Sequence, residues 1–131
     1  MKPKNNSVYL EQFLETGRIP VGIIDSHTHM NDVYGTCMCV YDYEETIRRV
    51  KEQGIAGIWC SPHCDLYNPL APNKEILEMM DRYPGYVRGY YGFNPNYADF
   101  YNVEDVLKHE GYIGFKTLPD YYRVPIDDAR Y

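Results

Sequence analysis

The stretch VGIIDSHTH, residues 21–29, decides the fold and places the candidate site. Its first part, residues 21–25, is short and apolar, and polar residues follow at once, which is the pattern of a buried strand. In parallel α/β folds the active site lies at the carboxyl ends of the strands. The two histidines therefore stand where such folds perform their chemistry.

Helical and strand patterns alternate beyond this stretch. We expect a first helix over residues 8–15, capped by Ser7 and ended by Gly17. Asp42 and Glu45 have the spacing of a capping box at the start of a second helix. Asn73 begins a third, whose apolar face is predicted to comprise Ile76, Leu77, Met80 and Tyr83, and Asn102 begins a fourth. Further strands are expected over residues 55–60, 86–93 and 112–116.

Strands that alternate with helices imply a parallel sheet with right-handed crossovers. Two α/β architectures fit, an open doubly wound sheet and a TIM (β/α)8 barrel. The doubly wound fold could be complete in 131 residues. A barrel needs about 250 residues, so the four strands would be its N-terminal half, a truncated (β/α)4-like unit.

The composition narrows the classes of partner. The chain carries 13 Lys and Arg against 19 Asp and Glu, a net charge of −6, which argues against binding nucleic acid through bulk charge. No apolar run approaches the roughly 18–20 residues of a membrane span, and the N-terminus lacks the apolar core of a secretory signal. We expect a cytoplasmic protein that acts on a small molecule, without nucleic-acid or membrane partners.

His27 and His29 are the candidate metal ligands. Residues two apart on an extended segment point the same way, so both imidazoles can reach one divalent cation, for which Zn²⁺ is expected. Asp25 would be a further ligand or an acceptor that orients a histidine. The alternative is a pair of surface histidines in a loop. A catalytic zinc normally takes three protein ligands, so the two histidines are an incomplete set.

Two other features bear on the site. The thiols of Cys37, Cys39, Cys60 and Cys64 are expected to be reduced and buried, although a structural zinc site is the alternative; His63 could line a pocket. Lys116 ends the last strand, and burying an unpaired ammonium there would be costly. It either binds a substrate carboxylate, lies near the metal or acts as a base, or it extends to the solvent at the rim.

Two motifs resemble a known family. IIDSHTH, residues 23–29, resembles the opening motif of the amidohydrolase superfamily. GFKTLP at 114–119, followed by VPIDDARY at 124–131, is similar to the "GxKxHP…YPxDDPRY" stretch of the amidohydrolase-related group. Two departures are Leu118 in place of the family histidine and Ala129 in place of a proline.

The resemblance implies a metal-dependent hydrolase or decarboxylase on a (β/α)8 barrel. His27 and His29 would be its first two metal ligands, and the family's others follow later strands. The chain would comprise an N-terminal helical extension, residues 1–20, and a partial barrel, residues 21–131. Such a half barrel exposes strand edges, so it is expected to be inactive alone and to dissolve poorly or form a homo-oligomer.

Three functions remain open. The first is a hydrolase that cleaves amide, ester or related bonds with a metal-activated water. The second is a metal-dependent decarboxylase of the same family. The third is a non-enzymatic module that binds a metal or a partner through its histidines and cysteines.

Overall fold

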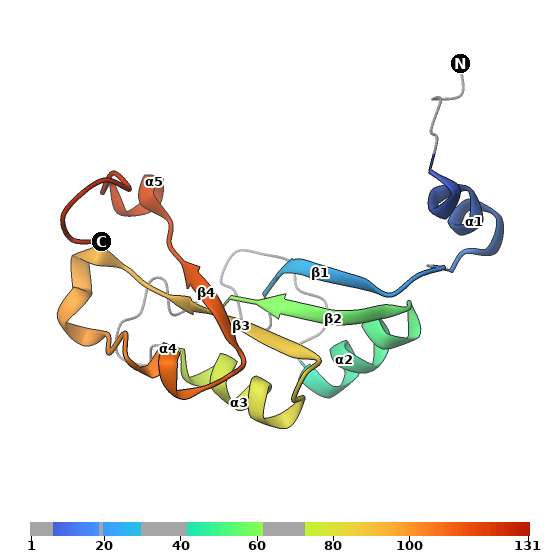
Figure 1. Cartoon of the computed structure of the whole chain (residues 1–131), viewed down its shortest axis with the longest axis horizontal. Coiled ribbons are helices and arrows are strands. Elements are labelled where there is room, and N and C mark those ends of the chain that lie inside the picture. The colour runs from blue at the N-terminus through green and yellow to red at the C-terminus, as the bar shows by residue number, and fades with distance from the viewer. Residues whose placement is uncertain (1–6, 19, 30–41, 62–72) are drawn as a thin grey trace, which may run out of the picture.

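The computed structural model describes residues 7–18, 20–29, 42–61 and 73–131. Its elements follow one another as helices and strands (Figure 1). They are α1 Val8–Thr16, β1 Ile23–Thr28, α2 Tyr43–Glu52, β2 Ile55–Cys60, α3 Lys74–Arg82, β3 Val87–Gly92, the 3-10 helix η2 Pro95–Phe100, α4 Asp105–Lys108, β4 Tyr112–Lys116 and α5 Pro119–Tyr122. The expected alternation is confirmed, while η2 and α5 are additional elements and α4 is shorter than its sequence pattern predicts.

The four strands form one parallel sheet in the order β1-β2-β3-β4. Each strand therefore lies beside its neighbour in the sequence. A doubly wound sheet reverses its strand order at a switch point, and these four strands show no reversal. Helices α2, α3 and α4 lie along one side of the sheet (Figure 1). None of these three helices lies on the opposite side, which is called the open face below.

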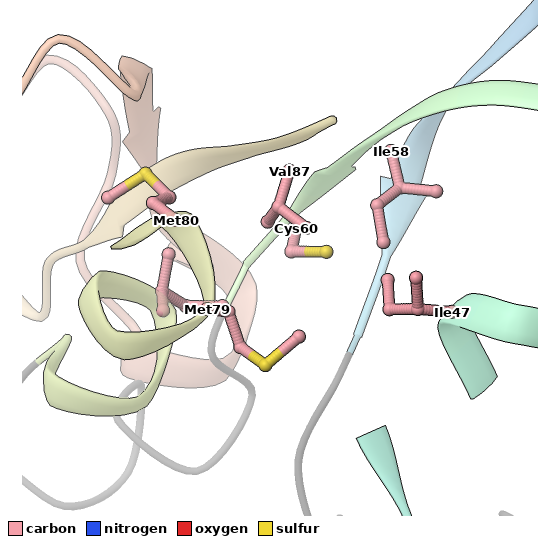
Figure 2. Packing of buried hydrophobic residues seen from close by; sticks show 7 residues of the cluster. Ile47, Ile58, Cys60, Met79, Met80 and Val87 are labelled. Carbon is pink, nitrogen blue, oxygen red and sulfur yellow. The ribbon is translucent and has the colours of Figure 1, made fainter. Parts of the chain in front are cut away.

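The core lies between the sheet and two helices (Figure 2). Ile58 and Cys60 of β2 and Val87 of β3 pack there against side chains of α2 and α3. The helical residues are Ile47, Ile76, Met79 and Met80, all buried. Met79 takes the core position expected for Leu77, which is 38% exposed.

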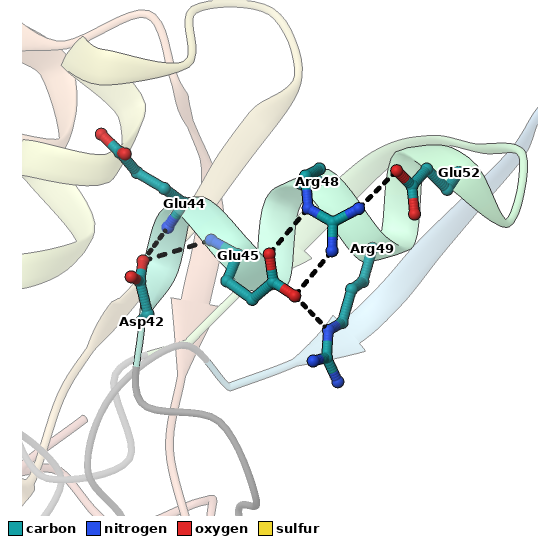
Figure 3. A network of polar contacts seen from close by, with 6 residues as sticks. All are labelled: Asp42, Glu44, Glu45, Arg48, Arg49 and Glu52. Atoms are coloured by element: carbon teal, nitrogen blue, oxygen red, sulfur yellow. Dashed lines mark hydrogen bonds and ion pairs between the residues drawn. The ribbon is translucent and has the colours of Figure 1, made fainter.

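Helix α2 is held at its start by Asp42. The Asp42 carboxylate accepts hydrogen bonds from the backbone N–H groups of Glu44 and Glu45 (Figure 3). The Asp42 half of the predicted capping box is therefore formed. The Glu45 carboxylate pairs with Arg48 and Arg49, which lowers its pKa to about 2.

Helix α3 begins differently from the expectation. Asn73 lies before it in the left-handed conformation, with φ 63°, and its side chain makes no capping bond to the helix. The buried side chain instead accepts a hydrogen bond from the N–H of Gly92 and donates one to the Gly92 carbonyl. Asn73 therefore joins the start of α3 to the carboxyl end of β3.

The segment after β4 forms a smaller apolar cluster. Tyr122 and Val124 are buried there, with Leu118 packed against them. Among the described residues, none of the helices is both long enough and apolar enough to cross a bilayer.

Candidate functional site

A β-bulge shapes the end of β1. Asp25 pairs with Ile58 and Thr28 pairs with Cys60, so three residue steps on β1 match two on β2. The additional residue falls at Ser26–His27, next to the predicted ligands. Bulges redirect side chains and often adjoin active sites. Here the bulge breaks the alternation of side chains between Asp25 and His27.

The two histidines lie side by side, as the sequence predicts. The centroids of the His27 and His29 rings are 5.2 Å apart, at an interplanar angle of 72°. The Nδ1 atom of His29 lies 3.0 Å from the carbonyl oxygen of Ser61, which can only accept a hydrogen bond. Nδ1 of His29 therefore carries a proton, and Nε2 carries the lone pair when the ring is neutral. A carbonyl that fixes the tautomer in this way is typical of metal-binding histidines.

Asp25 contacts the backbone of the same bulge. Its Oδ1 atom accepts a hydrogen bond of 3.1 Å from the backbone N–H of His27. The expectation that Asp25 shares a face with both histidines assumed a regular strand. The bulge changes that assumption, and the carboxylate instead supports the backbone of the bulge.

A pocket of about 310 Å³ adjoins His27. Four elements contribute to it, with Ser26 and His27 from β1, Ser61 after β2, Tyr90 from β3, and Phe115 and Lys116 from β4. The topology thus brings Lys116 and His27 to the same hollow, although three strand spacings separate their strands in the sheet. Lys116 pairs with Gly92 of β3, which anchors its backbone at the sheet's carboxyl end.

Four residues of this pocket, Ser26, Ser61, Tyr90 and Phe115, were not among the site residues predicted from the sequence. Ser61 directly follows the second strand, so its position at the carboxyl end was a usable signal. Tyr90 lies within β3, and its ring contacts Trp59 with centroids 6.4 Å apart. Tyr90 lines the pocket because its side chain lies on the same face of the sheet as the pocket. The sequence pattern alone did not show on which face of the sheet this side chain lies.

The donors suit a metal in kind but not in number. Imidazole nitrogens are common ligands of Zn²⁺ and similar cations. Within residues 7–18, 20–29, 42–61 and 73–131, however, no group of three or more His, Cys, Asp or Glu side chains is placed to hold an ion. His27 and His29 therefore supply part of a metal site, and a catalytic site needs at least one more ligand.

The cysteines do not add to this set where the structure describes them. Cys60 is fully buried in the core, and its Sγ lies 2.8 Å from the hydroxyl oxygen of Thr28. Burial raises the pKa of its thiol to about 11, so the thiol stays protonated at neutral pH. Three other cysteines, at positions 37, 39 and 64, and His63 lie outside the described residues.

The second motif organises the chain next to Lys116. Arg130 forms a two-pronged ion pair with Asp128, and its Nη1 donates to the side-chain oxygen of Asn96 at 3.0 Å. Thr117, which follows Lys116, donates to the phenol oxygen of Tyr131. These contacts tie the C-terminal segment to η2 and to the end of β4. The conspicuous charges of this motif thus have a local structural role.

Comparison of the chain with protein-family models, with curated proteins and with solved structures found no match. The likeness to amidohydrolase-related proteins therefore rests on the two motifs alone and stays a prediction.

Proposed function

We propose that this chain carries the first half of the active site of a metal-dependent hydrolase on a (β/α)8 barrel. The observation that carries the proposal is the pair of adjacent imidazoles, His27 and His29, beside a pocket that also holds Lys116. The position of the pair at the carboxyl end of β1 matches the placement of active sites in parallel α/β barrels.

The sheet supports the barrel part of this proposal. A barrel adds its strands in sequence order and keeps its helices outside, and the order β1-β2-β3-β4 with helices along one side has both properties (Figure 1). The open face would then be the barrel interior. Trp59 and Tyr90, whose rings touch on that face, would be part of its packed interior layers.

The roles of the residues follow from their contacts. When bound, a divalent metal lowers the pKa of a coordinated water and polarises the bond to be cleaved. His27 and His29 would hold it, and the Ser61 carbonyl would keep the His29 ring oriented. Lys116 supplies a positive charge across the pocket for an anionic or strongly polar substrate group. The hydroxyls of Ser26 and Ser61 provide neutral hydrogen-bonding groups at the same hollow.

A metal-dependent decarboxylase is the second candidate, and Lys116 is the observation that favours it. An ammonium group in the pocket suits the carboxylate that such an enzyme removes. Product analysis separates the two reactions, since a hydrolase adds water across a bond and a decarboxylase releases carbon dioxide.

The non-enzymatic module is the weaker alternative. It needs the cysteines as structural ligands, whereas the Cys60 thiol is protonated and packed into the core. Replacing Cys60 by Ala should therefore act as a core substitution and leave zinc binding unchanged.

An activity screen tests the hydrolase proposal. The protein is stripped with a chelator, reloaded with Zn²⁺ or Mn²⁺, and assayed against amides, esters and lactones, with and without a carboxylate in the substrate. Because this chain supplies only part of the ligand set, we expect metal-dependent turnover once the missing ligands are supplied by further sequence. That turnover should be lost in His27→Ala and His29→Ala and retained in His109→Ala, a histidine far along the chain that pairs with Asp81. Turnover that persists in both of the first two variants would overturn the proposal.

A further inference from the structure

Thr28 lies between the two candidate ligands, and its side chain joins β1 to β2. Its hydroxyl donates a hydrogen bond of 3.1 Å to the carbonyl oxygen of Trp59, and its Oγ1 lies 2.8 Å from Sγ of Cys60. Cys60 belongs to the core between the sheet and the helices, so the Thr28 side chain points to the helix-covered side. Neighbouring side chains of an extended segment alternate between faces, so His27 and His29 point the other way.

The direction of the two hydrogen bonds of Thr28 follows from the chemistry of their partners. A carbonyl oxygen can only accept, so the single hydroxyl proton of Thr28 is the one given to Trp59. The contact with Cys60 then uses the thiol proton, in keeping with a thiol that burial keeps protonated. The link between the two strands therefore depends on the Thr28 hydroxyl and needs no contribution from the thiol.

Thr28 and the next residue, His29, are tied to the end of β2 at three points. Besides the hydroxyl bond to Trp59, the Thr28 carbonyl accepts a hydrogen bond of 3.0 Å from the N–H of Ser61. Nδ1 of His29 lies 3.0 Å from the carbonyl oxygen of Ser61 and 3.2 Å from its hydroxyl oxygen. Ser61 is only 2% exposed, so water has little access to this contact. The orientation of the His29 ring thus depends on how closely the end of β1 is held against residues 59–61.

The bulge explains why a side-chain link matters at this position. The regular pairing of β1 with β2 is interrupted between Asp25 and Thr28. A bulge leaves its additional residue unpaired and disrupts the ladder locally. Side chains secure both ends of the irregular segment, since the Asp25 carboxylate accepts from the N–H of His27 and the Thr28 hydroxyl donates to β2. Thr28 is also the residue at which β1 is paired with β2 again.

We infer that Thr28 is a positioning residue for His29. Its hydroxyl holds the end of β1 against β2, and this places the Ser61 carbonyl where it keeps the proton of the His29 ring on Nδ1. Nε2 is then the nitrogen that carries the lone pair, which is the form of the ring that a metal binds. Only this last step rests on the proposed function, because the orientation of the ring is a property of the metal-free protein.

Nuclear magnetic resonance of the metal-free protein tests the inference. The ¹⁵N shifts of an imidazole show which nitrogen carries the proton, and the His29 signals are recognised by their loss in His29→Ala. At about pH 8.5, where ordinary histidines are neutral, the wild-type ring should carry its proton on Nδ1. Thr28→Val keeps the shape of the side chain and removes the hydroxyl, so the proton should distribute over both nitrogens. Thr28→Ser keeps the hydroxyl and should restore the wild-type spectrum.

Cys60→Ala is the matched control. It removes the other partner of the Thr28 hydroxyl oxygen from the same place in the core, but it leaves the bond from Thr28 to Trp59. It should lower the free energy of unfolding as a core substitution and leave the His29 spectrum unchanged. A loosened core would affect His29 alike in Thr28→Val and Cys60→Ala, whereas a positioning role of the hydroxyl separates the two variants.

Zinc affinity gives a second readout. Calorimetric titration should show a Kd that is about tenfold higher in Thr28→Val than in the wild type, because the ring that binds the metal is no longer held in one form. The Kd should be unchanged in Thr28→Ser and in Cys60→Ala.

Three results would overturn the inference. They are a wild-type His29 ring with its proton on Nε2, the same His29 spectrum in the wild type and in Thr28→Val, and an equal change in Cys60→Ala and Thr28→Val. The first of these needs no variant at position 28, so the inference is testable even if Thr28→Val does not fold.

The positioning role and the metal site can fail separately. A tautomer shift in Thr28→Val, together with a wild type that does not bind zinc, would keep the positioning role and reject the metal site. Zinc binding by the wild type, together with an unchanged tautomer in Thr28→Val, would do the reverse.

Discussion

One additional residue in β1 determines the arrangement of the candidate ligands. The sequence predicts that His27 and His29 lie together, and their rings are in contact range. The same alternation predicts that Asp25 joins them, but the bulge at Ser26–His27 intervenes. A bulge depends on the pairing with β2, which is a contact between distant segments. Local sequence periodicity therefore indicated that the two rings lie together, while the role of Asp25 at the site stays a prediction.

Asn73 shows a second limit of local patterns at the scale of a residue. Asparagine before a helix normally indicates a cap. Here its side-chain amide instead forms hydrogen bonds with the backbone groups of Gly92 at the end of β3. Asn73→Ala should lower the free energy of unfolding by about 1–3 kcal/mol, because the buried Gly92 groups lose their partners. Chemical denaturation measures it. Asn73→Gly is the control for backbone conformation, since glycine adopts the left-handed geometry freely, and it should cost less than alanine. Equal stability of the wild type and Asn73→Ala would contradict the assignment.

The ion pair of Asp128 and Arg130 predicts a pH dependence. The hydrogen bonds from the Arg130 guanidinium lower the pKa of Asp128 from 3.8 to about 2. A lowered folded-state pKa stabilises the protein above the unfolded value, and this contribution disappears as the pH falls from about 4 to 2. Wild-type protein should thus be more stable than Asp128→Asn at pH 6, with the difference shrinking across that acid range. Denaturation at several pH values measures the gap, with Asp127→Asn as the control. A stability difference between the wild type and Asp128→Asn that does not change between pH 6 and pH 2 would rule out this ion pair as its source.

At the scale of an element, the positions of helices and strands were predicted more accurately than the contacts of single residues. All four strands and the two long helices between them lie where the apolar patterns place them, because each is specified by its own buried face. The short α4 and the additional α5 depend on contacts of the C-terminal segment with the rest of the chain. Packing also determines which side chains of α3 enter the core. Met79 is buried there, whereas the predicted core residue Leu77 is 38% exposed.

The close approach of α3 to β3 gives a prediction at this scale. A Cβ atom at Gly89 would lie 2.6 Å from Cγ2 of Ile76 and 2.8 Å from Sδ of Met80. Gly89→Ala should therefore push α3 away from the sheet and lower the free energy of unfolding by about 1–3 kcal/mol. Gly57→Ala is the matched control on the neighbouring strand, where the nearest atom is the Tyr86 carbonyl oxygen at 3.4 Å. Thermal melts should show a clear loss for the first variant and a smaller one for the second.

At the scale of the whole molecule, the order of the strands is the informative feature. The sequence left two architectures open because strand and helix patterns do not reveal which strands are neighbours. The structure shows four consecutive parallel strands in one sheet, and the barrel of the proposed function stays a proposal.

Zinc titration of the chelator-stripped protein, followed by calorimetry, tests the central claim most directly. The account predicts that the wild-type chain binds Zn²⁺ and that His27→Ala and His29→Ala each weaken binding by more than about tenfold. His109→Ala should bind as the wild type does, because that histidine is engaged with Asp81 and with the N–H of Gly111. Zinc binding that is absent from the wild type, or equal in all of these variants, would contradict the assignment of His27 and His29 as metal ligands.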